Sequence, residues 1–137
     1  SPPFQNTALA SPGIHKVLDS YEIMGGPNTF LMVWATKKFR DENPKTYKAV
    51  LEAMKEATAA INADMKRAAE VYVKEGGGKQ TAEAILKIMQ SPGIKYTLAP
   101  EGVLPFAQFM HKIGTLKNEP KSWKDLFFPD IHDMQGS

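Results

Sequence analysis

The sequence predicts an α/β fold with a few short strands before residue 43 and a predominantly helical chain after it. Two observations lead to this prediction. Residues 29–36 form an apolar, β-branched and aromatic run without clean alternation, which is typical of an inner strand buried on both faces. Beyond residue 43, apolar residues recur at steps of three and four, which is the period of an amphipathic helix.

The segment before the apolar run is expected to hold loops and short strands. Prolines and a glycine favour loop over residues 1–13, with one helical turn around 7–9. Residues 14–24 are expected to hold one or two short strands, because residues 17–23 roughly alternate between apolar and polar types, as in a half-buried strand. Gly25-Gly26-Pro27 then predicts a tight turn, because glycine adopts positive φ freely and proline fixes its own φ.

The long amphipathic pattern begins at Asn43-Pro44, after one helical turn expected over residues 37–40. Asn43 is a good N-cap, and proline fits the first helical position because an N–H is not needed there. Asn62 and Asp64 are poor residues inside a helix and good caps, so we predict a break near residue 62. The pattern therefore predicts two helices, the second of which ends at Gly76-Gly77-Gly78.

Two shorter helices are predicted to follow. The first opens at Gln80 or Thr81 and ends at a Ser-Pro-Gly sequence. The second opens at Pro100-Glu101, or at Leu104 because a proline lies in its first turn. Gly114 is expected to follow its last turn as the C′ residue.

An aromatic cluster marks the C-terminal segment. Ser122 is predicted to cap a short helical turn that holds Trp123, Phe127 and Phe128 and ends at the next proline. We expect the cluster to fasten the tail onto a core, and an exposed aromatic platform is the alternative. Residues 133–137 are expected to fray.

The composition narrows the possible functions. A length of 137 residues fits one ordinary domain, and 17 basic against 15 acidic residues give no reason to invoke nucleic acid. The chain lacks cysteine, which excludes disulfides and thiolate metal sites. No apolar run approaches the length of a membrane span, and no signal peptide is visible in the sequence.

Few residues suggest bond chemistry. His15, His111 and His132 lack a metal-ligand spacing, and no thiol nucleophile or Gly-x-Ser-x-Gly elbow occurs. The glycines before Lys79 lack the spacing of a phosphate loop. We therefore expect no enzyme, no catalytic residue, no metal and no cofactor.

The turn from Gly25 to Thr29 is the most informative candidate for binding. Backbone N–H groups in a glycine-rich turn, next to the side chains of Asn28 and Thr29, can bind an oxyanion without a formal charge. The alternative is a plain turn that connects two strands.

A series of short motifs runs through nearly the whole chain in a fixed order: Pro2-Pro3-Phe4, 17–20, 25–29, 35–39, Asn43-Pro44, 49–61, Tyr96-Thr97, 100–103, 106–110, Gly114 and 122–129. Their order and spacing together resemble the periplasmic substrate-binding proteins of ABC importers for nitrate, sulfonates, taurine and thiamine-precursor-like compounds. The family is longer than this chain, so the resemblance implies that we have its C-terminal part.

The resemblance implies a fragment of a two-lobe periplasmic-binding-protein fold. Residues 1–28 would end the second lobe, and residues 29–36 would be the crossover strand between the lobes. Residues 37–137 would then form the helical C-terminal part of the first lobe. The sheet of that lobe would come mostly from the missing N-terminal part.

The resemblance also implies an extracytoplasmic solute-binding component of an ABC importer. Its small anionic or heteroaromatic solute would bind in the cleft between the lobes, lined here by Phe4, Gly26, Asn28 and Thr29. Partners would be the ABC permease in the membrane and the missing N-terminal part of the same protein, with self-association of the fragment as a further expectation. The location would be periplasmic, with the signal peptide in the missing part.

Two other functions stay open from the sequence. A pyrimidine synthase of the thiamine pathway resembles the same fold, but nothing marks His15 or His111 for its catalytic role. A self-standing helical interaction module is the other alternative, because apolar helix stripes need a partner surface.

Overall fold

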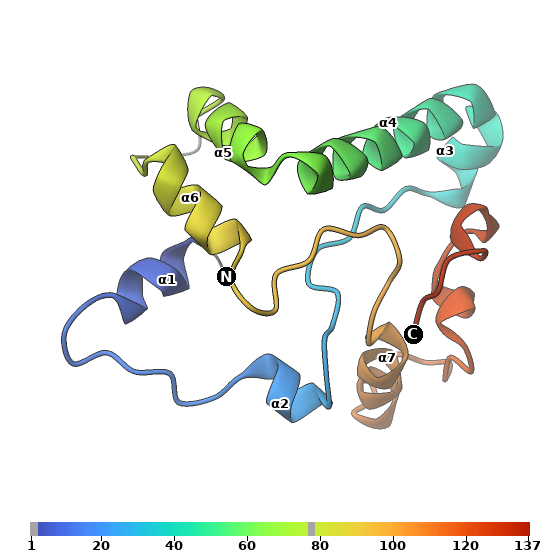
Figure 1. The fold of residues 1–137 in the computed structure, drawn as a ribbon. Helices are drawn as coiled ribbons and strands as arrows, with labels where there is room; N and C mark the ends of the chain where they lie inside the picture. The colour runs from blue at the N-terminus through green and yellow to red at the C-terminus, as the bar shows by residue number, and fades with distance from the viewer. Residues whose placement is uncertain (1–2, 77–78) are drawn as a thin grey trace. The chain divides into compact units, whose positions relative to one another are not determined.

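The computed structural model describes residues 3–76 and 79–137, and every regular element in these residues is a helix (Figure 1). The described residues hold no strand, so the predicted α/β class is wrong, and so is its form as a fragment of a two-lobe fold. The physical reason lies in residues 29–36. A strand needs a neighbour for its backbone groups, but residues 30–35 make no hydrogen bond to any described segment.

The chain divides into two compact units, and each is described by itself. Unit 1 comprises the described residues of 1–17 and 43–96. Unit 2 comprises residues 18–42 and 97–137.

Unit 1 contains helices α1 (Phe4–Leu9), α4 (Pro44–Ala63), α5 (Met65–Lys74) and α6 (Ala82–Met89). Helix α1 is longer than the single turn that the sequence predicts.

The predicted break in the long helical pattern of unit 1 is confirmed. Asp64 ends α4, and its carboxylate accepts a hydrogen bond from the Arg67 N–H at 2.9 Å to cap α5. Gly76 follows α5 with a φ of +98°, and Gly77-Gly78 lie outside the described residues. Thr81, the later of the two predicted starts, caps α6, with its hydroxyl accepting from the Ala84 N–H at 3.2 Å.

The core of unit 1 lies between α5 and α6. Ala69 on α5 is fully buried, and Ile85 and Met89 on α6 pack against it. An alanine at this position lets the two helix backbones approach closely. Partly buried hydrophobic side chains surround these three residues: Ile61, Met65, Ala68, Val73, Leu86 and Tyr96.

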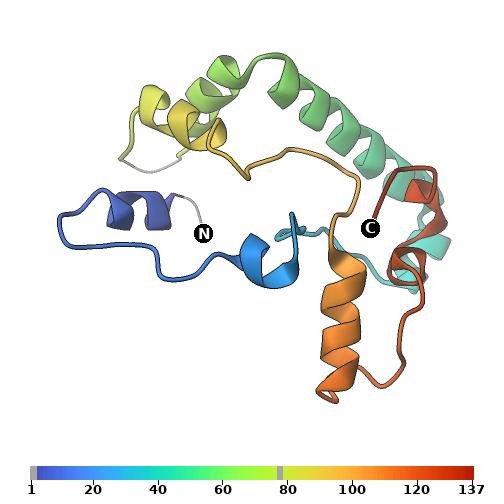
Figure 2. The same ribbon diagram turned by 60° about the horizontal axis from the view of Figure 1, so that its bottom comes forward.

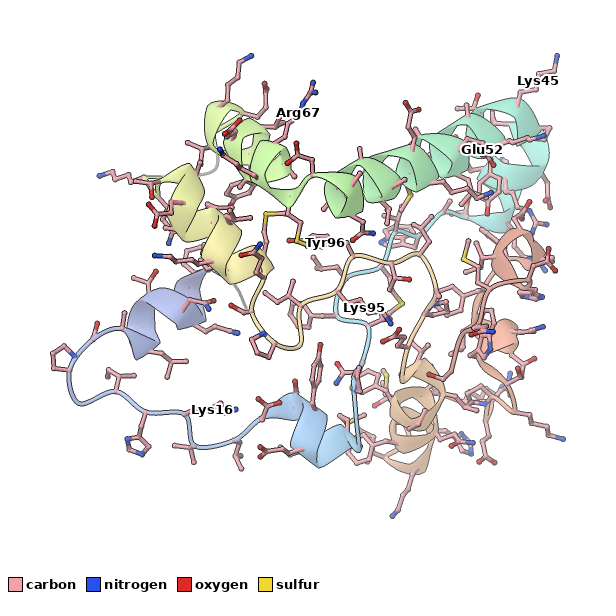
Figure 3. All side chains as sticks on the ribbon, viewed as in Figure 1. Lys16, Lys45, Glu52, Arg67, Lys95 and Tyr96 are labelled. Atoms are coloured by element: carbon pink, nitrogen blue, oxygen red, sulfur yellow. The ribbon has the colours of Figure 1, made fainter. Side chains whose placement is uncertain are left out.

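Tyr96 is attached to this core from the loop that follows α6 (Figure 3). Its backbone carbonyl accepts a hydrogen bond from Asn62 Nδ2 at 3.0 Å. Burial of the ring raises the pKa of the Tyr96 phenol above its ordinary value of 10.0.

Unit 2 contains α2 (Ser20–Met24), α3 (Lys37–Glu42), α7 (Val103–Lys112) and two short 3₁₀ helices, η1 (Trp123–Leu126) and η2 (Pro129–Ile131). The one or two short strands predicted over residues 14–24 are wrong, because every regular element in the described residues is a helix. The Asp19 carboxylate accepts a hydrogen bond from the Tyr21 N–H at 2.9 Å, and this local cap starts a helix where alternation suggested a strand.

The other elements of unit 2 follow the sequence closely. The turn predicted over residues 37–40 is confirmed as part of α3, and α7 begins close to the later of its two predicted starts. Gly114 has a φ of +82° just past α7, as a C′ glycine should. Pro129 does not end the C-terminal helical segment but starts η2, because proline also fits a first helical position.

The C-terminal tail of unit 2 does not fray. Ser137 donates its N–H to the Pro100 carbonyl at 2.9 Å, and its own carbonyl accepts from the Val103 N–H at 2.9 Å. In Figures 1 and 2 the C-terminus accordingly ends beside the start of α7. The predicted fraying is wrong because it considered only the local chain, and these partners are distant in sequence.

Trp123 is the buried side chain around which the tail folds, at 8% exposure. Phe127 and His132 both meet its ring edge-on, with centroids 6.0 and 5.8 Å away. Gly136 lies directly against the indole. The aromatic cluster therefore fastens the tail, as the sequence predicts.

Gly136→Ala should destabilise unit 2. The added Cβ would lie 2.6 Å from Trp123 Cε2, so the indole or the tail must shift. We expect the free energy of unfolding to fall by about 1–3 kcal/mol, which is typical of overpacking, in urea titrations followed by circular dichroism. Gln135→Ala, at the exposed neighbouring position, is the control. Equal stability of the two variants would contradict the packing of Gly136 on Trp123.

The raised pKa of Tyr96 predicts a loss of stability at alkaline pH. The folded state favours the neutral phenol, so its contribution is complete below the unfolded pKa and is lost as pH rises through the raised folded pKa. The free energy of unfolding should therefore fall above a pH of about 10, and Tyr96→Phe should flatten this fall. Tyr72→Phe, at a position 45% exposed, is the control, and an equal pH dependence of the two variants would contradict the role of Tyr96.

Candidate functional site

Three of the four predicted site residues lie on one loop of unit 2. Gly26, Asn28 and Thr29 follow α2, and all three are partly buried. Phe4 belongs to unit 1, where it begins α1 with its side chain 78% exposed. The loop after α2 is therefore the candidate site.

The glycines of the loop end a helix. Gly25 takes a φ of +80° as the C-cap of α2, and the Gly26 N–H donates to the Tyr21 carbonyl at 2.8 Å. The turn predicted between two strands is thus the C-terminal cap of α2. Since the Gly26 N–H already has a partner within the chain, the donors of a binding site must come from elsewhere on the loop.

Thr29 ties this loop to the segment that precedes α7. Its N–H donates to the Glu101 carbonyl at 2.7 Å, and its hydroxyl accepts from the Glu101 N–H at 2.8 Å. A residue that exchanges two such bonds with one partner is held in position and orientation. This reciprocal pair joins parts of the chain that are 72 residues apart.

Gly102 allows these two segments to touch. A Cβ at this position would lie 2.7 Å from the Pro27 carbonyl oxygen and 3.1 Å from Asn28 Cβ. Its φ of +61° also favours glycine. On its other side, the Gly102 N–H donates to Ser137 Oγ at 2.9 Å, so the tail supports the same junction.

Asn28 sits at this junction with an unused donor. Its Nδ2 is buried and has no hydrogen-bond partner in the described part of the chain. A buried donor without a partner costs about 1–3 kcal/mol, so the amide gains from any acceptor that reaches it. A solute oxygen or a ring nitrogen could supply that acceptor without any charged residue.

Two of the three histidines contact backbone carbonyls through a ring nitrogen, His111 Nδ1 with Leu116 at 2.9 Å and His132 Nε2 with Phe127 at 3.1 Å. His15 lies exposed in unit 1. Within residues 3–76 and 79–137, no group of three or more His, Asp or Glu side chains could hold a metal ion. None of the described helices is long and apolar enough to cross a membrane.

Sequence reasoning did not identify Glu101, Gly102 and Ser137 as part of this junction. The segment 100–103 was among the motifs of the resemblance, which is the only sequence signal that pointed to it. The contribution of Glu101 to the pair with Thr29 is made by its backbone alone, so its residue type could not have revealed it.

Comparisons with protein-family models, with curated proteins and with solved structures find no match for this chain. The candidate site is therefore defined by its own geometry, which is the loop after α2, the segment before α7 and the C-terminal serine.

Thr29→Val should loosen the junction. Valine keeps the shape of threonine but removes the acceptor of the Glu101 N–H, so the free energy of unfolding should fall by about 1–3 kcal/mol. Thr115→Val, at an exposed position, is the matched control and should change stability little. Urea unfolding of both variants measures the difference, and equal values would show that the hydroxyl bond contributes nothing.

Proposed function

We propose that this chain is the C-terminal part of the solute-binding component of an ABC importer, which binds a small anionic or heteroaromatic solute and catalyses no reaction. One observation carries the proposal. The unused donor of Asn28 lies where two motifs of the resemblance, 25–29 and 100–103, are hydrogen-bonded together. Motifs that share a site in space are what a common binding role requires.

The chemistry of Asn28 supports this class of solute. The free atom is an N–H donor, so its partner must be an acceptor, such as an oxygen of nitrate or of a sulfonate, or a ring nitrogen of a heteroaromatic compound. A buried amide donor and ordered backbone can bind such a group without a charged side chain. A solute that offers only donors, such as an ammonium ion, gains nothing from this atom.

The exposed apolar surface supports the partners of the proposal, which are a membrane permease and a preceding part of the same protein. Residues 30–34 are all hydrophobic and between 53% and 84% exposed. Helix α4 has no buried residue along its length. Surfaces of this kind mark sites of contact with another protein segment. We place the protein outside the cytoplasm, in the periplasm, on the resemblance alone.

The same surface favours a second candidate function, a helical interaction module that binds another chain or a second copy of itself. The two candidates differ in what stabilises the protein. The interaction module should show concentration-dependent sedimentation and no thermal shift with small solutes, whereas the importer component should show a shift with a solute.

Asn28→Leu should abolish most solute binding. A thermal-shift panel of nitrate, methanesulfonate and 4-aminopyrimidine, on the longest natural form of the protein, identifies a binder, and calorimetry measures its affinity. Loss of the donor should raise Kd roughly tenfold or more. Without solute, the melting temperature should stay unchanged or rise, because leucine removes an unpaired polar atom from a buried position.

Asn118→Leu is the matched control, since this asparagine is exposed and makes none of the hydrogen bonds of the junction. It should leave solute affinity unchanged. If no member of the panel binds, or if both variants bind a solute as tightly as the parent protein, the proposed role of Asn28 is wrong.

A further inference from the structure

A cavity of about 350 Å³ lies in unit 2 between α3 and the C-terminal segment, among residues other than those of the Asn28 junction. Lys37 and Arg40 of α3 line one side of it. The other side is residues 125–129, which run from η1 into η2. Figures 1 and 2 both place α3 beside this C-terminal segment. The volume is within the range of small-molecule sites.

Arg40 is fixed at the cavity by two contacts and still has N–H groups that can donate to a ligand. Its Nε and Nη2 donate to Asp41 Oδ1 at 3.0 and 2.8 Å, and its guanidinium carbon lies 4.4 Å from the centre of the Phe128 ring. A guanidinium has five N–H donors, so these two bonds leave three for a ligand. Contacts on two sides reduce the freedom that Arg40 would lose on binding.

Lys37 supplies a positive charge that has no acidic partner among the described residues. Its neighbour Lys38, in contrast, pairs with Glu42 at 3.9 Å. Lys37 and Arg40 lie three residues apart on one helix, which places them on the same face. The ammonium and the guanidinium therefore both border the cavity.

Asp125 is the one acidic residue in the lining. Its Oδ2 accepts from the N–H groups of Lys121 and Ser122 at 2.9 and 3.0 Å, which caps η1 and occupies that oxygen. Because Arg40 is paired with Asp41 and this oxygen of Asp125 is occupied, the ammonium of Lys37 is the charge at the cavity that no described carboxylate pairs. The rest of the lining is apolar and consists of Leu126, Phe127, Phe128 and Pro129.

We propose that this cavity binds a small monocarboxylate with an apolar body. The carboxylate would lie between Lys37 and the free N–H groups of Arg40, since a guanidinium matches the planar geometry of a carboxylate. The apolar body would cover Phe127 and Phe128. A fully hydrated anion such as inorganic phosphate would leave this apolar lining uncovered, and a neutral analogue would leave the Lys37 charge unpaired.

The test uses benzoate as the probe and benzyl alcohol as its neutral analogue, on the 137-residue chain. Titrations followed by two-dimensional NMR should show saturable shifts at residues 125–129 with benzoate and much weaker ones with benzyl alcohol. Inorganic phosphate should also bind more weakly than benzoate. Added salt should weaken benzoate binding, because the cavity is open to water.

Lys37→Gln should raise the Kd for benzoate about tenfold, and Lys38→Gln on the same helix should leave it unchanged. Circular dichroism checks that both variants keep their helices, and the NMR shifts of the unmodified chain test the site without any substitution. Equal binding of benzoate and benzyl alcohol, equal Kd values for the two lysine variants, or no saturable shift at residues 125–129 would overturn the proposal.

This site does not depend on the proposed importer function. Asn28→Leu should leave benzoate binding at residues 125–129 unchanged, and Lys37→Gln should leave solute binding at Asn28 unchanged. Each proposal can therefore be disproved without affecting the other.

Discussion

Unit 2 depends on the reciprocal pair of hydrogen bonds between Thr29 and Glu101. These bonds join the segment that leaves α2 to the segment that enters α7, which are far apart in the chain. Gly102 permits the contact because any Cβ there would collide with the Pro27 carbonyl. Ser137 then closes the arrangement from the other side with bonds to Pro100, Gly102 and Val103. These loops are thus held by backbone groups that bond to one another and to the hydroxyls of Thr29 and Ser137.

Hydrogen bonds are important for holding the loops because the described residues bury little apolar surface. In the described residues of unit 1, the buried hydrophobic side chains are Ala69, Ile85 and Met89, and in unit 2 they are Val103, Ala107 and Trp123. Small cores of this kind contribute modest stability, since the hydrophobic effect scales with the area removed from water. The hydrophobic residues 30–34 are likewise exposed and add no buried area to the core of unit 2. Each unit therefore relies on caps and long-range polar contacts to fix its loops.

The sequence could predict those features that depend on neighbouring residues. Caps at Asp64, Thr81 and Ser122 lie where expected, because a side chain and an N–H two or three residues away form them. Residue types within 29–36 could not decide whether a strand forms there, because a strand must pair with another segment of the chain. The prediction that the tail frays is wrong for the same reason, since Ser137 bonds to residues that are distant in sequence. In the candidate site, Asn28 and Thr29 were recognised by residue type, whereas Glu101 contributes through its backbone and gave no such signal.

The two tryptophans of unit 2 differ sharply in environment, and this difference makes them optical reporters. Trp34 is 84% exposed within residues 30–35, which make no hydrogen bond to any described segment, whereas Trp123 is 8% exposed against His132 and Gly136. An exposed indole emits at longer wavelength than a buried one. If Trp123 is replaced by phenylalanine, the fluorescence of Trp34 reports on residues 30–35. If Trp34 is replaced instead, the fluorescence of Trp123 reports on the C-terminal tail. Tryptophan fluorescence can therefore show whether the tail detaches before the rest of unit 2 unfolds.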